Sequence, residues 1–296
     1  MPLIIPEDIP AFLLLKENAF VMGKKRASHQ DIRPLEVLIF NLMPLKIETE
    51  NQIFSLLANS PLQVNITLLS TKSYVGKNTP QQHLNRFYVN FDDIKGKHFD
   101  GAIITGAPIE HLAFEEVQYW GEFVEIMDFL RESCTSSIYL CWGAMAGLYH
   151  FHNISKISLS EKMFGVYAHT NNHNDLLTIG LNDFVKIPHS RHSGINEAQV
   201  RENKNLKILL EGKESGITML KDSKDIFILG HPEYAKNTLL NEYKRDLEKG
   251  LEIQKPQNYF KENLEPNFSW RSSASVIFSN WLNFSVYQDT PFALER

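Results

Sequence analysis

Short apolar runs alternate with helical stretches through the first half of the chain, and this alternation restricts the possible folds more than any other feature. Such runs, each too short for a helix, lie at 35–40, 64–69, 102–105 and 137–140. Continuous apolar runs of this length are typical of strands buried on both faces of a parallel sheet. Segments with apolar residues at helical spacing lie at 47–57, 120–130 and 142–150. The pattern predicts an α/β fold with a doubly wound, mostly parallel, flavodoxin-like sheet.

The rest of the chain extends this pattern without adding a second unit. Residues 1–33 show no clear periodicity and are expected to form an irregular N-terminal extension on the α/β core. Further strands are predicted at 207–210, 216–220 and 226–229, the first two as a hairpin, and helices at 238–249 and 273–287. The 296 residues are 43% hydrophobic, enough for one large core, and include no low-complexity linker. We therefore expect a single domain over 1–296 with extensions at both ends.

Charge and hydropathy exclude several classes of protein. The net charge is -5 and no block of Lys and Arg stands out, so we expect no nucleic-acid partner. No stretch reaches the about 18 apolar residues of a membrane-spanning helix, and the N-terminus lacks the pattern of a signal peptide. The two cysteines, Cys134 and Cys141, flank one predicted strand, so no disulfide between them is expected. These features predict a cytoplasmic protein without membrane contact.

Cys141 stands at the end of a predicted buried strand, where a sharp turn leads into a helix of small residues. This is the arrangement of a nucleophile elbow. A thiol at a helix N-terminus faces the positive end of the helix dipole and free backbone N–H groups, and both favour the thiolate. The N–H of Trp142 is a candidate to stabilise an oxyanion. A lone cysteine at such a position is, however, equally compatible with a buried structural role.

A second predicted strand end carries the residues that a cysteine nucleophile needs. The strand at 226–229 leads directly into the turn that contains His231 and Glu233. Because ligands bind at the carboxyl ends of parallel strands, we expect this turn to lie near Cys141. His231 can act as general base, and Glu233 can hold the imidazole in the required tautomer. The three residues are a candidate catalytic triad, although a histidine beside a proline in a loop would alone indicate little.

Metal and nucleotide sites have weaker support. Several histidines cluster in one part of the sequence: His169, His173, His189 and His192. The chain contains neither HExxH nor a CxxC pair, and histidines are also common in polar turns, so we expect no metal site. The glycine-rich motifs of dinucleotide and P-loop sites are absent from the sequence. We therefore expect no permanently bound cofactor.

Sequence blocks from near residue 1 to about 292 carry a family resemblance. In chain order they are 20–22, 26–28, 32–35, 41–44, 46–52, 59–64, 105–108, 161–162, 165–167, 188–191, 230–234, 245–246 and 269–272. The blocks resemble the homoserine O-acyltransferase family of methionine biosynthesis, in the branch with a class I glutamine amidotransferase-like fold. The resemblance implies a two-step, ping-pong acyl transfer. Cys141 would attack an acyl-CoA thioester, and the hydroxyl of L-homoserine would then attack the acyl-cysteine, with His231 as general base and Glu233 orienting it.

The same resemblance assigns substrate contacts. It implies that Lys162, Ser190 and Arg245 hold homoserine or shape its pocket. Lys46 follows a predicted strand end, and we expect it to lie near the acyl or CoA group. The fixed charge of Arg245 suits an amino-acid carboxylate, although its neighbours alone would indicate a solvated helix face. The family also implies a homodimer, for which the apolar segment around Trp281 is one candidate contact, with core packing as the alternative.

Glu110 is the residue that the resemblance connects with the choice of acyl donor. Family members with glycine at this place after Gly-Ala-Pro-x use succinyl-CoA, and those with glutamate use acetyl-CoA. A glutamate fills the space that a longer acyl chain needs, and its charge opposes the succinyl carboxylate. Two like charges about 4 Å apart repel by about 4 kcal/mol at an effective dielectric constant of 20. The prediction is acetyl transfer from acetyl-CoA, although Glu110 in isolation also fits a surface loop.

Other functions stay open on the sequence alone. A homoserine O-succinyltransferase would keep the same mechanism with another donor. A class I glutamine amidotransferase or related cysteine hydrolase would share Cys, His and Glu in this order, but its elbow usually has glycine where this chain has Tyr139. A small-molecule sensor without activity would be expected to lack part of the triad, and all three members are present.

Overall fold

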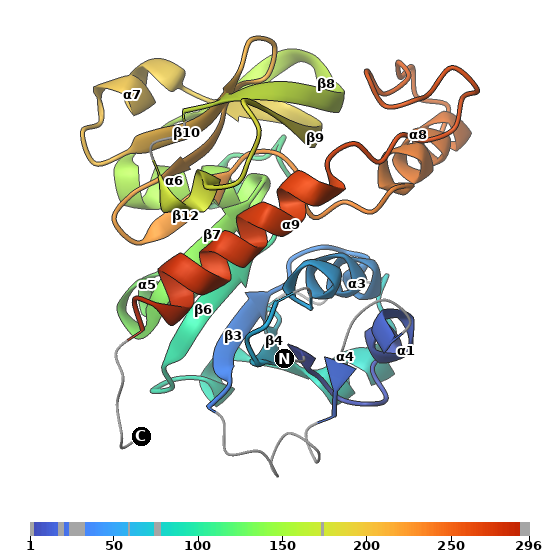
Figure 1. Ribbon diagram of the computed structural model, residues 1–296. Coiled ribbons are helices and arrows are strands. Elements are labelled where there is room, and N and C mark those ends of the chain that lie inside the picture. Colours follow the sequence, from blue (N-terminus) through green and yellow to red (C-terminus); the bar gives the residue numbers. More distant parts are fainter. Residues whose placement is uncertain are drawn as a thin grey trace.

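The computed structural model describes residues 3–16, 21–23, 33–58, 60–73, 78–172 and 175–290. Across these residues the strands form one 12-stranded sheet with helices on both faces (Figure 1). Most neighbouring strands pair in parallel, so the predicted α/β fold with a mostly parallel sheet is confirmed. None of the helices within the described ranges combines the length and apolar content needed to cross a bilayer.

The sheet has a parallel part and an antiparallel part. The parallel part contains β1 (Leu3–Ile4), β2 (Val21–Met22), β3 (Leu35–Phe40), β4 (Val64–Leu69), β5 (Tyr88–Val89), β6 (Phe99–Ile104), β7 (Cys134–Leu140) and β12 (Asp225–Ile228). The antiparallel part contains β8 (Lys156–Asn171), β9 (Phe184–Ile195), β10 (Lys207–Gly212) and β11 (Gly216–Lys221). The strand order is β2-β1-β4-β3-β6-β7-β12-β11-β10-β8-β9, with β5 beside β4. Strand β12 joins the two parts, because it pairs in parallel with β7 and antiparallel with β11.

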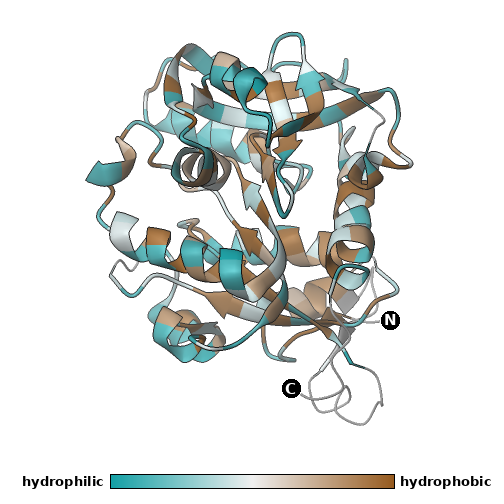
Figure 2. Cartoon of the chain, turned by 90° about the vertical axis from the view of Figure 1, so that its left-hand side faces the viewer, coloured by the Kyte–Doolittle hydropathy of each residue, from teal (hydrophilic) through white to brown (hydrophobic). Residues whose placement is uncertain are grey.

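Most of the helices are half exposed and bury their apolar sides, whereas α6 (Trp142–His152) is buried all round through residues 142–148. The helices are α1 (Pro10–Lys16), α3 (Lys46–Leu57), α4 (Gln81–Phe87), α5 (Trp120–Ser133), α6, α7 (Glu197–Glu202), α8 (Thr238–Glu248) and α9 (Arg271–Asn280), with single turns η1 (Phe91–Asp93), η2 (Phe114–Glu116) and η3 (Leu176–Thr178) and the π-helical η4 (Trp281–Tyr287). Figure 2 shows brown, hydrophobic stretches along the central strands, whereas the helices carry both colours. This is the pattern of strands covered on both faces by helices that are half exposed.

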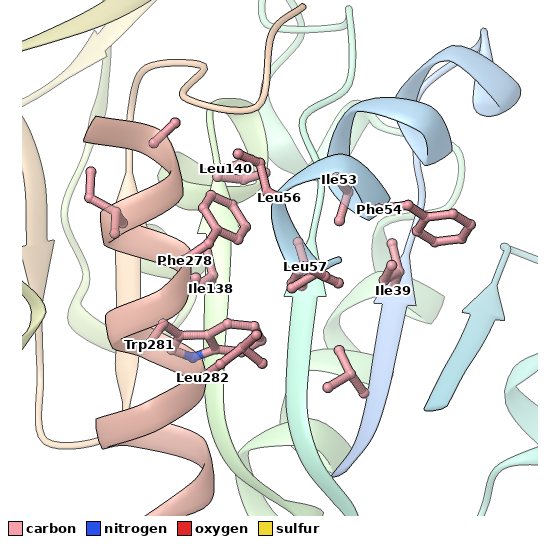
Figure 3. Close-up of a cluster of buried hydrophobic side chains, with 14 of the residues drawn as sticks. Ile39, Ile53, Phe54, Leu56, Leu57, Ile138, Leu140, Phe278, Trp281 and Leu282 are labelled. Atoms are coloured by element: carbon pink, nitrogen blue, oxygen red, sulfur yellow. The ribbon is translucent and has the colours of Figure 1, made fainter. Parts of the chain in front are cut away.

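Two apolar cores lie on opposite faces of the parallel part. On one face, α9 and η4 pack beside α3, and Phe278, Trp281 and Leu56 meet over Ile138 and its neighbours (Figure 3). The segment around Trp281, considered above as a contact between subunits, is therefore used in this core. On the other face, α5 and α6 cover the sheet with a second cluster.

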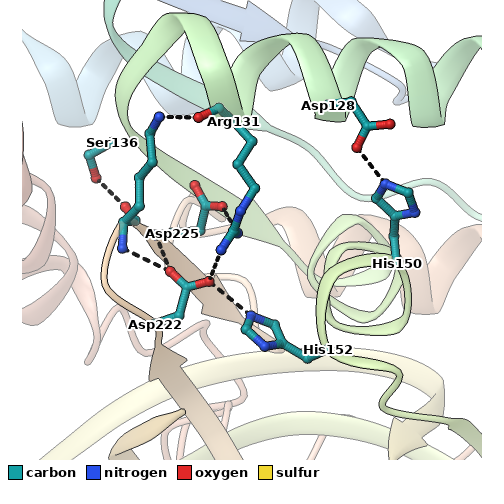
Figure 4. Close-up of polar contacts among 8 residues, drawn as sticks. Asp128, Arg131, Ser136, His150, His152, Asp222 and Asp225 are labelled. Atoms are coloured by element: carbon teal, nitrogen blue, oxygen red, sulfur yellow. Dashed lines mark hydrogen bonds and ion pairs between the residues drawn. The ribbon is translucent and has the colours of Figure 1, made fainter. Parts of the chain in front are cut away.

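A polar cluster fixes the amino ends of β7 and β12 (Figure 4). Arg131, at the end of α5, donates to Asp222 at 2.8 Å and to Asp225 at 2.5 Å, and His152 at the end of α6 lies 2.8 Å from Asp222. Burial, and after it the charge of Asp222, raise the pKa of Asp225 to about 7. The pairing of Asp225 with Ser137 begins the parallel register of the two strands, which therefore end side by side at the opposite edge of the sheet.

One sequence prediction about the fold is wrong, and one large element was missed. The N-terminal region is not irregular where the structure describes it, because β1 lies between β2 and β4 and α1 packs on α3. Elements of two and seven residues are too short to show a period. The predicted hairpin of β10 and β11 is confirmed. The long hairpin of β8 and β9, however, was not predicted at all.

Candidate active site

Cys141 lies in a sharp turn between β7 and α6, with φ 48° and ψ -114°. A positive φ is strained for a residue with a side chain, and such strain accompanies nucleophile elbows. The surroundings hold the turn closely. The N–H of Cys141 donates to the carbonyl of Ile228 at 2.7 Å, and a β-carbon on Gly143 would lie 2.6 Å from the carbonyl oxygen of Thr105. The thiol is thus fixed at the carboxyl edge of the sheet.

The structure brings His231 and Glu233 to the same edge, directly after β12. Nδ1 of His231 lies 2.7 Å from Oε1 of Glu233, and Nε2 is left to face the thiol of Cys141, with which His231 shares a hydrogen bond. Burial opposes the charged imidazolium, but the charges of Cys141 and Glu233 and the hydrogen bonds to both raise the pKa of His231 well above its ordinary value. The backbone N–H of His231 donates to Pro188 of β9 at 2.8 Å, and the ring stacks on Tyr234 at 4.1 Å. This geometry can support a thiolate–imidazolium pair.

The backbone around the elbow offers donors for an oxyanion. As the first residue of α6, Trp142 has no earlier helical carbonyl to which its N–H could donate. The end of β6 faces this N–H, since a β-carbon on Gly106 would lie 3.6 Å from it and 3.2 Å from the β-carbon of Cys141. The indole of Trp142 instead packs in the core, with its ring 5.2 Å from that of Phe123. Any role of Trp142 in catalysis must therefore come from its backbone.

The hydroxyl of Ser190 on β9 is connected with the imidazole of His231 through Glu242 and Tyr234, and the sequence gave no reason to select Glu242. Ser190 donates to Oε2 of Glu242 at 2.5 Å, and the hydroxyl of Tyr234 donates to Oε1 of Glu242 at 2.7 Å. Because Tyr234 stacks on His231, the carboxylate of Glu242 is one side chain away from the candidate base. Glu242 lies on α8 in a charged segment, and nothing in that local pattern separates it from solvated neighbours.

Lys162 and Arg245 meet at another carboxylate of α8. Nζ of Lys162 lies 3.2 Å from Oδ2 of Asp246, and the guanidinium of Arg245 donates to Oδ1 at 2.8 Å. Burial first, and then the charge of Glu242, raise the pKa of Glu48 on α3, which is also attracted to Arg245. The predicted substrate residues Lys162, Ser190 and Arg245 thus belong to one polar region of mixed charge between β8, β9, α3 and α8.

Glu110 is not a free surface glutamate. Its Oε2 accepts hydrogen bonds from the backbone N–H groups of His192 at 2.8 Å and Ser193 at 2.9 Å. Its carbonyl oxygen accepts one from Lys156 at 2.8 Å. The buried guanidinium of Arg191, between Ser190 and His192 on β9, interacts electrostatically with both Cys141 and Glu110. The carboxylate is therefore fixed against β9 by His192 and Ser193.

Lys46 lies at the same edge of the sheet, two strands from Cys141. It begins α3 after the end of β3, and Nζ donates to the carbonyl of Asn41 and lies 5.4 Å from the centre of the Tyr88 ring. Burial lowers the pKa of Lys46 to about 8, against the attraction of Glu50. The ammonium of Lys46 is therefore buried and held by Asn41 and Tyr88.

The histidine cluster lies on β8 and β9 and not in polar turns. Nε2 of His169 lies 3.2 Å from Nε2 of His189 and 2.8 Å from the hydroxyl of Ser215, and Arg191 donates to His189 at 3.2 Å. Burial and the charge of Arg191 lower the pKa of His169 to about 4. His173 lies outside the described residues, as do the family block at 26–28 and residue 20 of the block at 20–22. Within the part of the chain that the structure covers, no three His, Cys, Asp or Glu side chains are grouped to hold a metal ion.

Known proteins match this chain over almost its whole length. A family model described as homoserine O-succinyltransferase matches residues 2–292. A homoserine O-acetyltransferase of Campylobacter jejuni (strain RM1221) is 58% identical over 297 residues, which cover 99% of this chain and 100% of that protein. A homoserine O-acetyltransferase of Clostridium beijerinckii is 52% identical over 301 residues, with 99% of each chain covered.

Solved structures support the fold. A glutamine amidotransferase from Thermotoga maritima superposes with a TM-score of 0.58 at 11% identity, covering 86% of this chain and 100% of that one. At this identity the likeness concerns the fold alone, and it agrees with the predicted amidotransferase-like architecture. The family model and the close relatives carry the identification: the chain belongs to the homoserine O-acyltransferase family that this model describes.

Proposed function

We propose that the protein transfers an acetyl group from acetyl-CoA to the hydroxyl of L-homoserine, giving O-acetyl-L-homoserine and CoA. The single observation that carries the mechanism is the buried chain of contacts from Cys141 through His231 to Glu233, at the end of two adjacent parallel strands. The full-length similarity to homoserine O-acetyltransferases supports the choice of substrates. No permanently bound cofactor is needed, since acetyl-CoA is consumed as a cosubstrate.

In the first half-reaction, the thiolate of Cys141 attacks the carbonyl carbon of the thioester. The N–H of Trp142 stabilises the negative oxygen of the tetrahedral intermediate. The carbon–sulfur bond to CoA then breaks, and the CoA thiolate takes the proton of the His231 imidazolium. The enzyme is left as an acetyl-cysteine beside a neutral imidazole, which Glu233 holds in the tautomer with a free Nε2.

In the second half-reaction, neutral His231 accepts the proton of the homoserine hydroxyl as the oxygen attacks the acetyl carbon. The bond to Sγ of Cys141 breaks, which restores the thiolate and the imidazolium. The polar region on α8 suits the acceptor. Arg245 and Lys162 carry the charge that pairs with an α-carboxylate, and Glu242, close to the stacked Tyr234, carries the charge that pairs with an α-ammonium. Ser190 orients Glu242.

The position of Glu110 supports acetyl-CoA over succinyl-CoA as the acyl donor. Two backbone N–H groups fix its carboxylate, so it cannot swing aside to admit a longer acyl group without losing both hydrogen bonds. Its negative charge opposes a succinyl carboxylate in the same place. Lys46, at the same sheet edge, is expected to lie near the acyl or CoA group, because it follows the end of β3.

The test is the intact mass of the protein after brief exposure to acetyl-CoA with homoserine withheld. We expect one acetyl adduct that maps to Cys141 and not to Cys134, and its discharge as O-acetylhomoserine when L-homoserine is added. Cys141→Ala is the control and should form no adduct. A succinyl adduct from succinyl-CoA in preference would contradict the donor assignment, and the absence of any adduct would contradict the mechanism.

Assembly and location complete the proposal. We expect a homodimer, as the family implies, and its oligomeric state in solution can be measured by light scattering. We also expect the cytoplasm, where acetyl-CoA is available and where two free cysteines stay reduced.

A further inference from the structure

A cavity of about 500 Å³ lies beside the candidate active site, between β8, β9 and the loop after α8. Its volume is within the range of about 300–1,000 Å³ that is usual for pockets holding drug-sized ligands. Its walls include Lys162 and Phe164 of β8, His192 of β9, and Ile253 and Lys255 of the loop. Homoserine, a single small amino acid, would fill only a fraction of this space.

An irregularity in the β8–β9 hairpin creates the cavity. Ser158 pairs with Ser193 and Met163 with Arg191, so residues 159–162 on β8 stand opposite His192 alone on β9. The extra residues form a bulge, and the bulge residues Ser160, Glu161 and Lys162 line the cavity together with His192. Bulges next to active sites re-aim side chains in this way.

The loop at 251–257 forms the outer wall of the cavity, and backbone hydrogen bonds attach it to β8 beyond the bulge. The N–H of Val166 donates to the carbonyl of Gln257 at 2.8 Å, and the N–H of Gln257 donates to the carbonyl of Phe164 at 2.9 Å. A β-carbon on Gly165 would lie 2.4 Å from the carbonyl oxygen of Gln257, so only glycine permits this approach. The loop at 251–257 is therefore a built wall of the cavity.

Two of the wall residues connect the cavity with the reacting groups. The backbone N–H of His192 holds the carboxylate of Glu110, which we assign to acyl selection. Phe164 on β8 pairs with Ser190 on β9, whose hydroxyl contacts Glu242 in the acceptor region. The cavity thus borders the strand that holds Glu110 and, through Lys162 and Asp246 in its walls, the acceptor region.

We propose that this cavity binds the pantetheine arm of the acyl-CoA donor, with the phosphates toward Lys255 at the rim. The proposal rests on the acyl transfer proposed above. A pantetheine arm combines amide groups with a branched apolar unit and carries no charge. The lining offers the amides of Gln254 and Gln257, the apolar Phe164 and Ile253, and the exposed ammonium of Lys255. The carboxylates of Glu161 and Glu252 are exposed and can turn to solvent.

The test separates donor from acceptor through the ping-pong kinetics. In such a mechanism kcat/KM for acetyl-CoA reports only the first half-reaction, and kcat/KM for homoserine only the second. Ser160→Trp places a large ring in the cavity from an exposed position. Ser158→Trp, exposed on the same strand outside the lining, is the matched control.

We expect Ser160→Trp to lower kcat/KM for acetyl-CoA by about tenfold or more, while kcat/KM for homoserine stays within about twofold. The same variant should keep an unchanged kcat/KM for the short thioester S-acetyl-N-acetylcysteamine, which lacks most of the pantetheine arm. Lys255→Ala should lower kcat/KM for acetyl-CoA but not for S-acetyl-pantetheine, which lacks the nucleotide. A loss confined to homoserine, or equal effects of the two tryptophan variants, would overturn the proposal.

Direct titration of CoA into the unaltered protein distinguishes this proposal from the proposed function. CoA binding that is weakened in Ser160→Trp and kept in Ser158→Trp supports the cavity assignment whether or not acetyl transfer is observed. Equal CoA binding by both variants overturns it even where the protein acetylates homoserine.

Discussion

A β-carbon on Gly143 would lie 2.6 Å from the carbonyl oxygen of Thr105, closer than real β-carbon contacts come. This relationship sets how near α6 can approach the end of β6. Because Cys141 precedes α6 directly, the same approach places the thiol at the sheet edge and not above it. The glycine is required by packing, and it acts on the nucleophile through the position of the helix.

Gly143→Ala is therefore expected to destabilise the protein by about 1–3 kcal/mol, as overpacking of a tight contact does. It should also slow the acetylation of Cys141, because α6 has to move outward. Gly121→Ala is the matched control, since Gly121 is exposed in α5 with nothing within 4 Å of a β-carbon. The free energy of unfolding of that variant should be unchanged or slightly higher. Equal stability of the two variants in urea titration would refute the packing argument.

The two cysteines should differ sharply in reactivity. Burial raises the pKa of Cys134 to about 12, so this thiol stays protonated at neutral pH. Cys141 faces an imidazole whose raised pKa favours the thiolate–imidazolium pair. We expect iodoacetamide at pH 7 to label Cys141 alone, and brief pretreatment with acetyl-CoA to protect it. Peptide mapping by mass spectrometry measures this, and faster labelling of Cys134 would count against the assignment.

The central parallel strands β3, β4, β6, β7 and β12 could be predicted from the sequence because each contains an isolated apolar run, whereas the two-residue strands β1, β2 and β5 could not. Strand β4, for example, has the predicted bounds 64–69. The β8–β9 hairpin could not be predicted, since its outer strands alternate irregularly and include a bulge that breaks the two-residue period. It is this hairpin that contributes Lys162, Ser190 and the contacts of Glu110.

The candidate site was predictable in part for the same reason. Cys141 and His231 follow strand ends, and the carboxyl ends of parallel strands are where ligands bind. Glu242 was missed because its role depends on two contacts that its own helix does not reveal. Ser190 lies on β9, far away in the sequence, and Tyr234 precedes α8. The sequence of a charged helix has the same pattern whether its carboxylates face solvent or a pocket. Only the packing of α8 against the β8–β9 hairpin distinguishes the two cases.

Glu233→Gln tests the orienting carboxylate through the pH profile. The negative charge of Glu233 is one of the causes that raise the pKa of His231, so its removal should lower that pKa. The imidazolium of His231 then loses its proton at a lower pH. The alkaline limb of the pH profile of kcat/KM for acetyl-CoA therefore moves to lower pH. We expect the maximum to fall by about 10²–10⁴-fold. An unshifted limb would show that Glu233 does not set the charge of His231.

Glu110→Gly should move donor preference toward succinyl-CoA. The substitution removes both the bulk and the charge that oppose a succinyl carboxylate. A third of the direct repulsion is enough to change the ratio of kcat/KM values about tenfold. Glu110→Gln separates the two causes, because it keeps the size and an oxygen for the N–H groups of His192 and Ser193. If charge dominates, Glu110→Gln follows Glu110→Gly; if space dominates, it stays near the unaltered protein. A donor ratio unchanged in both would remove Glu110 from acyl selection.

Arg245→Lys examines the acceptor half-reaction alone. The lysine keeps the charge but loses the planar pair of donors that matches a carboxylate, and it also weakens the contact with Asp246. We expect kcat/KM for homoserine to fall by about 10–100-fold. The rate at which acetyl-CoA acetylates Cys141 should be unchanged, because no acceptor is present in that step. Lys244→Met, on the neighbouring exposed position of α8, should leave both half-reactions intact. Slower acetylation in Arg245→Lys would place this side chain with the donor or with the stability of the site, and not with homoserine.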